Sequence, residues 1–154
     1  MKKLSPVFFV LIILSFSLPF LNLSCGGSQY RLSGFDIAFG TTIPRGQGFS
    51  YGNNNEMQDF YALGAFILAV LGLLLSLMKS KQVKIYNIIL SGVGVILMIF
   101  SKIGISRSTA YYLDKPPYYL LISYGVGYYL VLIFFILSLA FNAYLIYLTK
   151  KPQL

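Results

Sequence analysis

Long apolar stretches separated by short polar segments dominate the sequence. Four stretches are apolar enough to cross a membrane, and they cover residues 4–22, 60–78, 85–101 and 125–149. A helix of about 20 apolar residues is about 30 Å long, which matches the hydrocarbon thickness of a bilayer. The pattern therefore predicts an all-α membrane protein, a four-transmembrane-helix bundle that forms a single domain over residues 1–154. Its outer loops are expected at 23–59 and 102–124, and its inner loop at 79–84.

The last apolar stretch is longer than one span requires, because it extends from about Tyr119 to Thr149. A helix of that length has to tilt strongly or begin in the membrane interface. Gly125 and Gly127 stand near its start, and glycine weakens a helix interior. We therefore expect a break at these glycines.

The first outer loop contains local signals for short secondary structure. Ser33 followed by Asp36 has the spacing of a helix N-cap, and Gly40 suits the end of that helix. The segment Ser28–Leu32 has the pattern of a short strand, which needs a partner strand to be stable. Thr41–Asn55 is rich in glycine and asparagine, so an irregular loop is expected there.

Composition excludes a water-soluble globule. Of the 154 residues, 57% are hydrophobic and 10% are charged, whereas soluble domains carry about 25% charged residues. The net charge of +8 does not indicate a nucleic-acid partner, because no basic patch of the kind that neutralises phosphates is present.

Positive charge is unevenly distributed among the segments between the apolar stretches. Seven lysines have no acidic residue in their segments, and five Lys or Arg residues share the other two connectors with all four acidic residues. Segments richer in Lys and Arg stay in the cytoplasm, so both termini are predicted to be cytoplasmic. The seven lysines are Lys2, Lys3, Lys79, Lys81, Lys84, Lys150 and Lys151, and the acidic residues are Asp36, Glu56, Asp59 and Asp114.

The residue types that carry catalysis are scarce in this chain. It has no His and one Cys, and no two acidic residues flank a site within the apolar stretches. Acid–base catalysis, activated nucleophiles and zinc coordination all depend on such side chains. We therefore predict a protein that is not an enzyme, with no catalytic, cofactor-binding or metal-binding residues. An ion pair between Asp59 and Lys102 at the outer membrane edge is the one charged pairing that we consider.

Small residues recur on one face of the second span at spacings of three or four residues. Because lipid provides little hydrophobic force between spans, close approach of backbones at small residues stabilises their packing. The third span offers a partly matching face, so the two spans are predicted to pack as an antiparallel hairpin. An interface between copies of the chain is the alternative use. The predicted packing residues are Ala62, Ala65, Ala69, Gly72, Ser76, Ser91 and Gly94.

The single cysteine, Cys25, admits three roles. It is a packing residue or free thiol, a contact or disulfide with an external partner, or a site of lipidation. Lys2 and Lys3, an apolar core and Ser24 give the N-terminal segment the outline of a lipoprotein signal. Asn22 departs from that pattern, because an aliphatic residue is typical three positions before the cysteine. Whether the N-terminal segment is retained or cleaved before Cys25 stays open.

The segment from Pro19 to Gly40 resembles a group of uncharacterised small four-span bacterial membrane proteins. The matching elements are Pro19-Phe20, then Cys25-Gly26-Gly27 after four residues, and later Ser33-Gly34 with Gly40 after five more. The resemblance implies a four-span fold and a bacterial envelope location, and it implies no reaction. Claudin-like four-span proteins also have a larger first outer loop, but this chain lacks their Trp-Gly-Leu-Trp element and their cysteine pair.

These observations favour a non-catalytic accessory or scaffold subunit of a membrane complex in a bacterial cytoplasmic membrane. Its contacts would be the lipid bilayer and either a membrane-protein partner or a second copy. One alternative is a homo-oligomeric channel or small transporter lined by the second and third spans. Another is a three-span lipoprotein acylated at Cys25.

Overall fold

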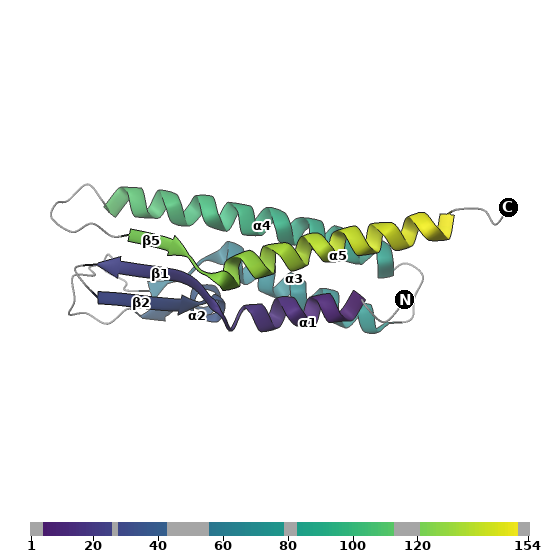
Figure 1. Cartoon of the computed structure of the whole chain (residues 1–154), viewed down its shortest axis with the longest axis horizontal. Coiled ribbons are helices and arrows are strands. Elements are labelled where there is room, and N and C mark those ends of the chain that lie inside the picture. The colour runs from purple at the N-terminus through teal and green to yellow at the C-terminus, as the bar shows by residue number, and fades with distance from the viewer. Residues whose placement is uncertain (1–4, 26–27, 43–55, 79–82, 113–120, 151–154) are drawn as a thin grey trace.

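A computed structural model describes residues 5–25, 28–42, 56–78, 83–112 and 121–150. Four helices form an elongated bundle: α1 (Ser5–Ser15), α3 (Phe60–Leu77), α4 (Val83–Tyr112) and α5 (Val126–Lys150). A small sheet and the short helix α2 (Gly34–Phe39) lie at one end of the bundle, termed the sheet end (Figure 1). The start of α1 and the end of α5 lie at the opposite end, termed the terminus end.

Three of the helices are long and apolar enough to cross a membrane. These segments are Phe60–Leu77, Val83–Ile105 and Val126–Leu148. By length and composition, the chain is therefore a multi-pass integral membrane protein. Helix α1 has 11 residues and is about 16 Å long, which is shorter than the hydrocarbon layer. The predicted first span over residues 4–22 is thus wrong beyond Ser15, and the structure supports three of the four predicted spans.

Helix α1 ends at Ser15 because hydroxyl groups and a proline compete with the helix. The hydroxyl of Ser15 donates to the carbonyl oxygen four residues earlier, and that of Ser17 to the carbonyl oxygen three residues earlier, each at 2.7 Å. Such bonds give the backbone an alternative to further helix. Pro19 has no N–H to donate, and it disfavours the helical conformation at Leu18. The chain therefore turns and continues as a strand.

The sheet consists of three antiparallel strands in the order β2 (Ser28–Ser33), β1 (Pro19–Cys25) and β5 (Leu121–Tyr124). Leu23 at its centre lies opposite Tyr30 on β2 and Ile122 on β5. The strand predicted within Ser28–Leu32 is confirmed, and its partner β1 combines the end of the predicted first span with the first residues of the predicted outer loop. Strand β1 follows α1, and β5 leads into α5, so two neighbouring strands continue two helices that also pack together.

Helix α2 has the predicted capping arrangement. The Ser33 hydroxyl accepts from the backbone N–H of Asp36 at 3.2 Å, and the Asp36 carboxylate accepts from the backbone N–H of Ser33 at 2.8 Å. This is a capping box. Gly40 follows the helix at φ 84°, a conformation that glycine adopts without strain. The predicted short helix is therefore confirmed, and its buried residues Ile37 and Ala38 belong to the main core.

A second, two-stranded sheet pairs β3 (Thr41–Thr42) with β4 (Glu56–Met57). Most of the irregular loop predicted between these strands, residues 43–55, lies outside the described residues.

Helices α4 and α5 differ from their predicted boundaries at the sheet end. Helix α4 has 30 residues and is about 45 Å long, so residues 102–112 of the predicted outer loop are helical. Residues 121–124 of that loop form β5. Helix α5 begins at Val126, beside the glycine at which a break was expected. The long α4 runs past the bundle to lie alongside the sheet (Figure 1).

Aromatic rings join the sheet to the bundle in one continuous core. The ring of Phe16 lies 5.0 Å from Phe20, 6.2 Å from Phe35 and 5.3 Å from Phe66, measured between centroids. These rings come from the end of α1, from β1, from α2 and from α3. The sheet therefore shares the hydrophobic core of the helices rather than forming a separate unit.

Candidate functional site

A buried polar cluster at the terminus end connects all four bundle helices. The amide nitrogen of Asn87 on α4 donates to the hydroxyls of Ser76 on α3, at 2.7 Å, and Ser5 on α1, at 3.1 Å. The hydroxyl of Ser5 donates in turn to the carboxamide oxygen of Asn142 on α5 at 3.2 Å. Because the bonds cross between helices that are far apart in the sequence, they fix the helices relative to one another.

The cluster continues one turn deeper into the bundle. The hydroxyl of Ser91 on α4 donates to that of Ser138 on α5 at 2.9 Å, and the Asn142 amide donates to the backbone carbonyl of Ser138 at 2.8 Å. The side-chain oxygen of Asn87 is buried and has no hydrogen-bond partner among the described residues. The clustered side chains are hydroxyls and carboxamides, so the site offers hydrogen bonding between helices and no acid–base chemistry.

Replacing Asn87 with alanine should lower the stability of the bundle by about 1 kcal/mol, in the range measured for hydrogen bonds between membrane helices. The change removes bonds from α4 to both α1 and α3. Asn22→Ala is a suitable control, because no hydrogen bond to another described residue is found for the Asn22 side chain. Thermal unfolding in one detergent measures both variants, and equal midpoints for the two variants would contradict the role assigned to the cluster.

The junction between sheet and bundle is built on glycines. Phe20 forms a bulge in β1, because Pro19 pairs with Ser33 whereas Leu21 pairs with the adjacent Leu32. A Cβ atom placed on Gly34 would lie 2.7 Å from the Phe20 ring, and one on Gly127 would lie 2.8 Å from it.

Gly125, between β5 and α5, lets its own backbone lie directly against the backbone at the start of β1. Its N–H donates to the Phe20 carbonyl at 2.7 Å, and a Cβ atom there would lie 2.2 Å from the Pro19 carbonyl oxygen. Pro19, Phe20 and Gly34, which carry the resemblance described above, therefore lie together at this junction.

The predicted stripe of small residues on α3 lies inside the bundle. Ala62, Ala65, Ala69 and Gly72 are buried, and Ser76 belongs to the polar cluster. Helices α3 and α4 pack against each other.

Two of the glycines in this set accommodate aromatic rings from other helices. Gly72 lies against Phe9 of α1, and a Cβ atom there would be 2.3 Å from the ring. Gly94 on α4 lies against Phe135 of α5, with a corresponding distance of 2.5 Å. Sequence reasoning missed these aromatic partners, because nothing local identifies which ring faces which glycine.

Asp59 and Lys102, the charged residues considered as an ion pair, contact different partners at the sheet end. Asp59 caps α3 by accepting from the backbone N–H of Tyr61 at 2.9 Å, and it also accepts from the Ser101 hydroxyl. Lys102 lies over the Tyr124 ring, 5.3 Å from its centroid, and the Tyr124 hydroxyl donates to the Lys102 carbonyl at 3.0 Å. The structure thus gives each of these charges a partner other than the ion pair considered from the sequence.

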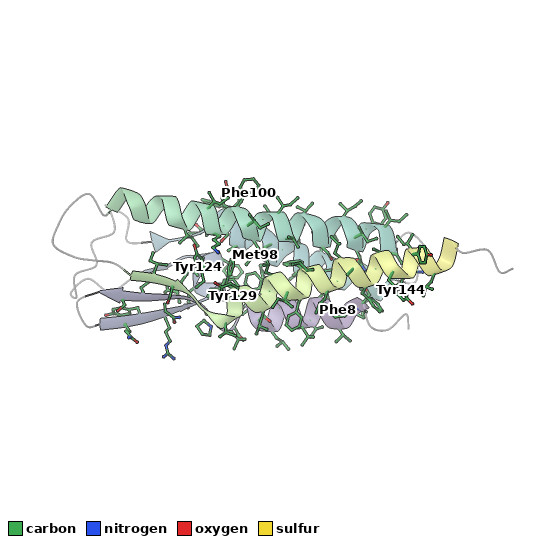
Figure 2. The ribbon with its side chains drawn as sticks, turned by 45° about the horizontal axis from the view of Figure 1, so that its top comes forward. Phe8, Met98, Phe100, Tyr124, Tyr129 and Tyr144 are labelled. Atoms are coloured by element: carbon green, nitrogen blue, oxygen red, sulfur yellow. The ribbon has the colours of Figure 1, made fainter. Side chains whose placement is uncertain are left out.

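Aromatic residues gather at both ends of the spans. Figure 2 shows Tyr124 and Tyr129 where β5 meets α5, and Tyr144 near the far end of α5. Phe100 points away from the bundle at the level of the first group. Such rings settle at membrane–water interfaces, so the two groups suit the two ends of membrane-spanning helices.

Cys25 is the last residue of β1, and its backbone pairs with Ser28. The structure does not describe its side chain. In the part of the chain that is described, no three His, Cys, Asp or Glu side chains come together in a way that could hold a metal ion.

Comparisons with protein-family models, with curated proteins and with solved structures found no match to this chain.

Proposed function

We propose that this protein is a non-catalytic accessory or scaffold subunit of a membrane complex, located in a bacterial cytoplasmic membrane. The observation that supports this most is the way the sheet is built onto the bundle. Strand β1 follows α1, β5 leads into α5, and the sheet shares the core of the helices. A rigid projection fixed to membrane spans suits the presentation of a surface to another protein better than the turnover of a substrate.

The proposed orientation places the sheet end outside the cell. Ser5 and the end of α5 lie together at the terminus end (Figure 1), and the lysines without acidic neighbours adjoin that end in the sequence. Segments rich in Lys stay in the cytoplasm. The sheet and α2 would then face the extracytoplasmic side, in agreement with the location that the resemblance to small bacterial four-span proteins implies.

A homo-oligomeric channel lined by α3 and α4 is the weaker candidate. Over residues 62–77 of α3 and 87–100 of α4, every exposed side chain is apolar. A path lined by these faces would leave ions without hydrogen-bonding groups, at a large cost in free energy. The polar side chains of Ser76, Asn87 and Ser91 are directed instead into the bundle, where they bond to Ser5 of α1 and Ser138 of α5. The exposed set includes Ile67, Leu71, Leu74, Ile89, Val93, Ile96 and Ile99.

Retention of the N-terminal segment is expected. Cleavage before Cys25 would remove α1 and all of β1 except its last residue, so the sheet would lose its central strand. It would also remove Ser5 from the polar cluster and Phe9 from its position against Gly72. The intact mass of the purified protein should therefore include residues 1–24. A mature chain that begins at an acylated Cys25 would establish the lipoprotein alternative instead.

Cross-linking from two positions tests the proposed function. A photoreactive residue is placed either at Gln29, exposed on the sheet, or at Leu71, exposed on α3. After irradiation in native membranes, the tagged protein is isolated in mild detergent. A foreign membrane protein recovered in one-to-one ratio from either position supports an accessory subunit, and the position identifies the contact. Recovery of cross-linked copies of this chain alone would contradict the proposal and favour the homo-oligomer.

A further inference from the structure

The outer sheet has one apolar and one polar face. Side chains on alternate positions point to opposite faces. Leu21 and Leu23 on β1 and Leu32 on β2 are buried in the main core. The intervening positions of β1 and β2, and position 123 of β5, carry hydrogen-bonding side chains that face away from the bundle, and these are Asn22, Ser24, Gln29, Arg31 and Ser123.

The polar face is organised in rows across the strands. Arg31 on β2, Asn22 on β1 and Ser123 on β5 lie directly opposite one another in the register. Gln29 and Ser24 form the next row. Arg31 and Ser123 are exposed, and no hydrogen bond or ion pair joins any of these five side chains to another residue in the described segments. Among the described residues, a guanidinium group beside a carboxamide and a hydroxyl is therefore available for contact with a ligand.

The position of the row formed by Arg31, Asn22 and Ser123 along the bundle axis can be compared with that of the aromatic group. The row lies one residue beyond Leu21 and Tyr124, which are paired on β1 and β5. One residue of strand corresponds to about 3.3 Å. Tyr124 belongs to the aromatic group where β5 meets α5 and bonds to the Lys102 carbonyl. If this aromatic group lies at the membrane interface, Arg31 lies just outside it, which is the level of lipid phosphates.

The exposed surface of α1, next to the sheet, is apolar. Helix α1 exposes Val7, Val10 and Leu14, and the turn that joins it to β1 exposes Leu18, so exposed apolar residues recur at spacings of three or four. These side chains form a strip along α1 that ends where the sheet begins. The strip can contact an acyl chain while the polar row contacts the corresponding headgroup.

We propose that the polar face of the outer sheet binds the phosphate headgroup of a lipid, with Arg31 as its anchor. The five hydrogen-bonding side chains on this face include one cation and no anion, so its charge complements a phosphate. The planar guanidinium donates two parallel hydrogen bonds to phosphate oxygens, a geometry that lysine does not reproduce. Asn22 and Ser123 supply further donors in the same row. This proposal is independent of the proposed function, because lipid binding is measured on the purified chain without a partner protein.

Native mass spectrometry tests the proposal with phosphatidylglycerol as the probe. The full chain is purified in mild detergent, exposed to the lipid and compared with the Arg31→Gln and Arg31→Lys variants. We expect Arg31→Gln to weaken retention at least about tenfold, because the loss of even one of the two charge-assisted hydrogen bonds corresponds to that change. Lipid retention by Arg31→Lys should lie between that of the wild type and that of Arg31→Gln. Lys84→Gln, at the opposite end, should retain the lipid as the wild type does.

Two further probes distinguish the contribution of the phosphate group to binding from that of the acyl chains. Diacylglycerol with the same acyl chains lacks the phosphate and should not be retained, and glycerol phosphate lacks the chains and should not compete. Equal retention by Arg31→Gln and the wild type, in a variant whose melting temperature is unchanged, would overturn the proposal. The proposal would also be overturned if Arg31→Gln left lipid retention unchanged but abolished the cross-link from Gln29 to a partner protein. Competition by glycerol phosphate alone would assign the face to free phosphate esters and likewise overturn the lipid assignment.

Discussion

Gly125→Ala is expected to destabilise the protein strongly. The added methyl group would lie 2.2 Å from the carbonyl oxygen of Pro19, and a backbone atom cannot move aside as a side-chain terminus can. To make room for the methyl group, the backbone at Gly125 would have to move away from the backbone at Pro19. That movement would weaken the hydrogen bond from the Gly125 N–H to the Phe20 carbonyl and the pairing of β1 with β5. Overpacking costs 1–3 kcal/mol in soluble cores, and we expect a loss of at least about 3 kcal/mol here.

Gly104→Ala provides the matched control for this prediction. A methyl group there would lie 3.7 Å from the Tyr61 ring, which is ordinary van der Waals contact. Alanine is also preferred to glycine within a helix by about 1 kcal/mol. The melting temperature of Gly104→Ala in detergent should therefore equal or exceed that of the wild type, while Gly125→Ala should melt much lower or fail to accumulate. Similar melting temperatures for both variants would show that the junction is not packed as described.

Gly72→Ala is expected to destabilise the protein through its contact with Phe9, and shortening the ring should rescue it. The methyl group would lie 2.3 Å from the Phe9 ring, so α1 would be forced away from α3. We expect Gly72→Ala alone to cost about 2–3 kcal/mol, and Phe9→Leu alone to cost about 1–2 kcal/mol, since both disturb a close-packed contact.

The double variant distinguishes this contact from a general effect on the helix. If the ring and the glycine meet directly, Gly72→Ala combined with Phe9→Leu should cost less than the sum of the single changes, with a coupling of 0.5–3 kcal/mol. The midpoints of thermal unfolding in one detergent give the four values of the cycle. Strict additivity would mean that Phe9 does not pack against Gly72, and that the stripe on α3 faces some other element.

The spans and the short outer helix could be predicted because their signals are local. Uninterrupted apolar length identified α3, α4 and α5, and a capping residue with an acid three positions later identified α2. The limits of the first span were missed because the apolar stretch over residues 4–22 continues through Ser15, Ser17 and Pro19. Their combined effect depends on hydroxyl bonds to the backbone that become visible only in the structure.

The sheet and the polar cluster could not be predicted because their contacts are not local. Strand β1 pairs with β5 about one hundred positions later in the chain, and β5 lies in a segment with no strand signal of its own. Ser5 and Asn142 were polar residues near opposite ends of the sequence, and helix packing brings them together. Asn87 and Asn142 were identifiable as polar groups at depth, but their shared partners were not.

The pairing of residues 22 and 123 is the most direct test of this account, because both proposals depend on a sheet built from the segment that follows α1. Asn22→Cys and Ser123→Cys are combined in a Cys25→Ser background and oxidised in native membranes. The two positions lie opposite each other in the register on the same face, so a disulfide should form rapidly. Asn22→Cys with Ile122→Cys places the thiols on opposite faces and should not cross-link. Failure of the first pair, or equal cross-linking of both, would contradict the sheet and favour a first span that continues as a helix to Asn22.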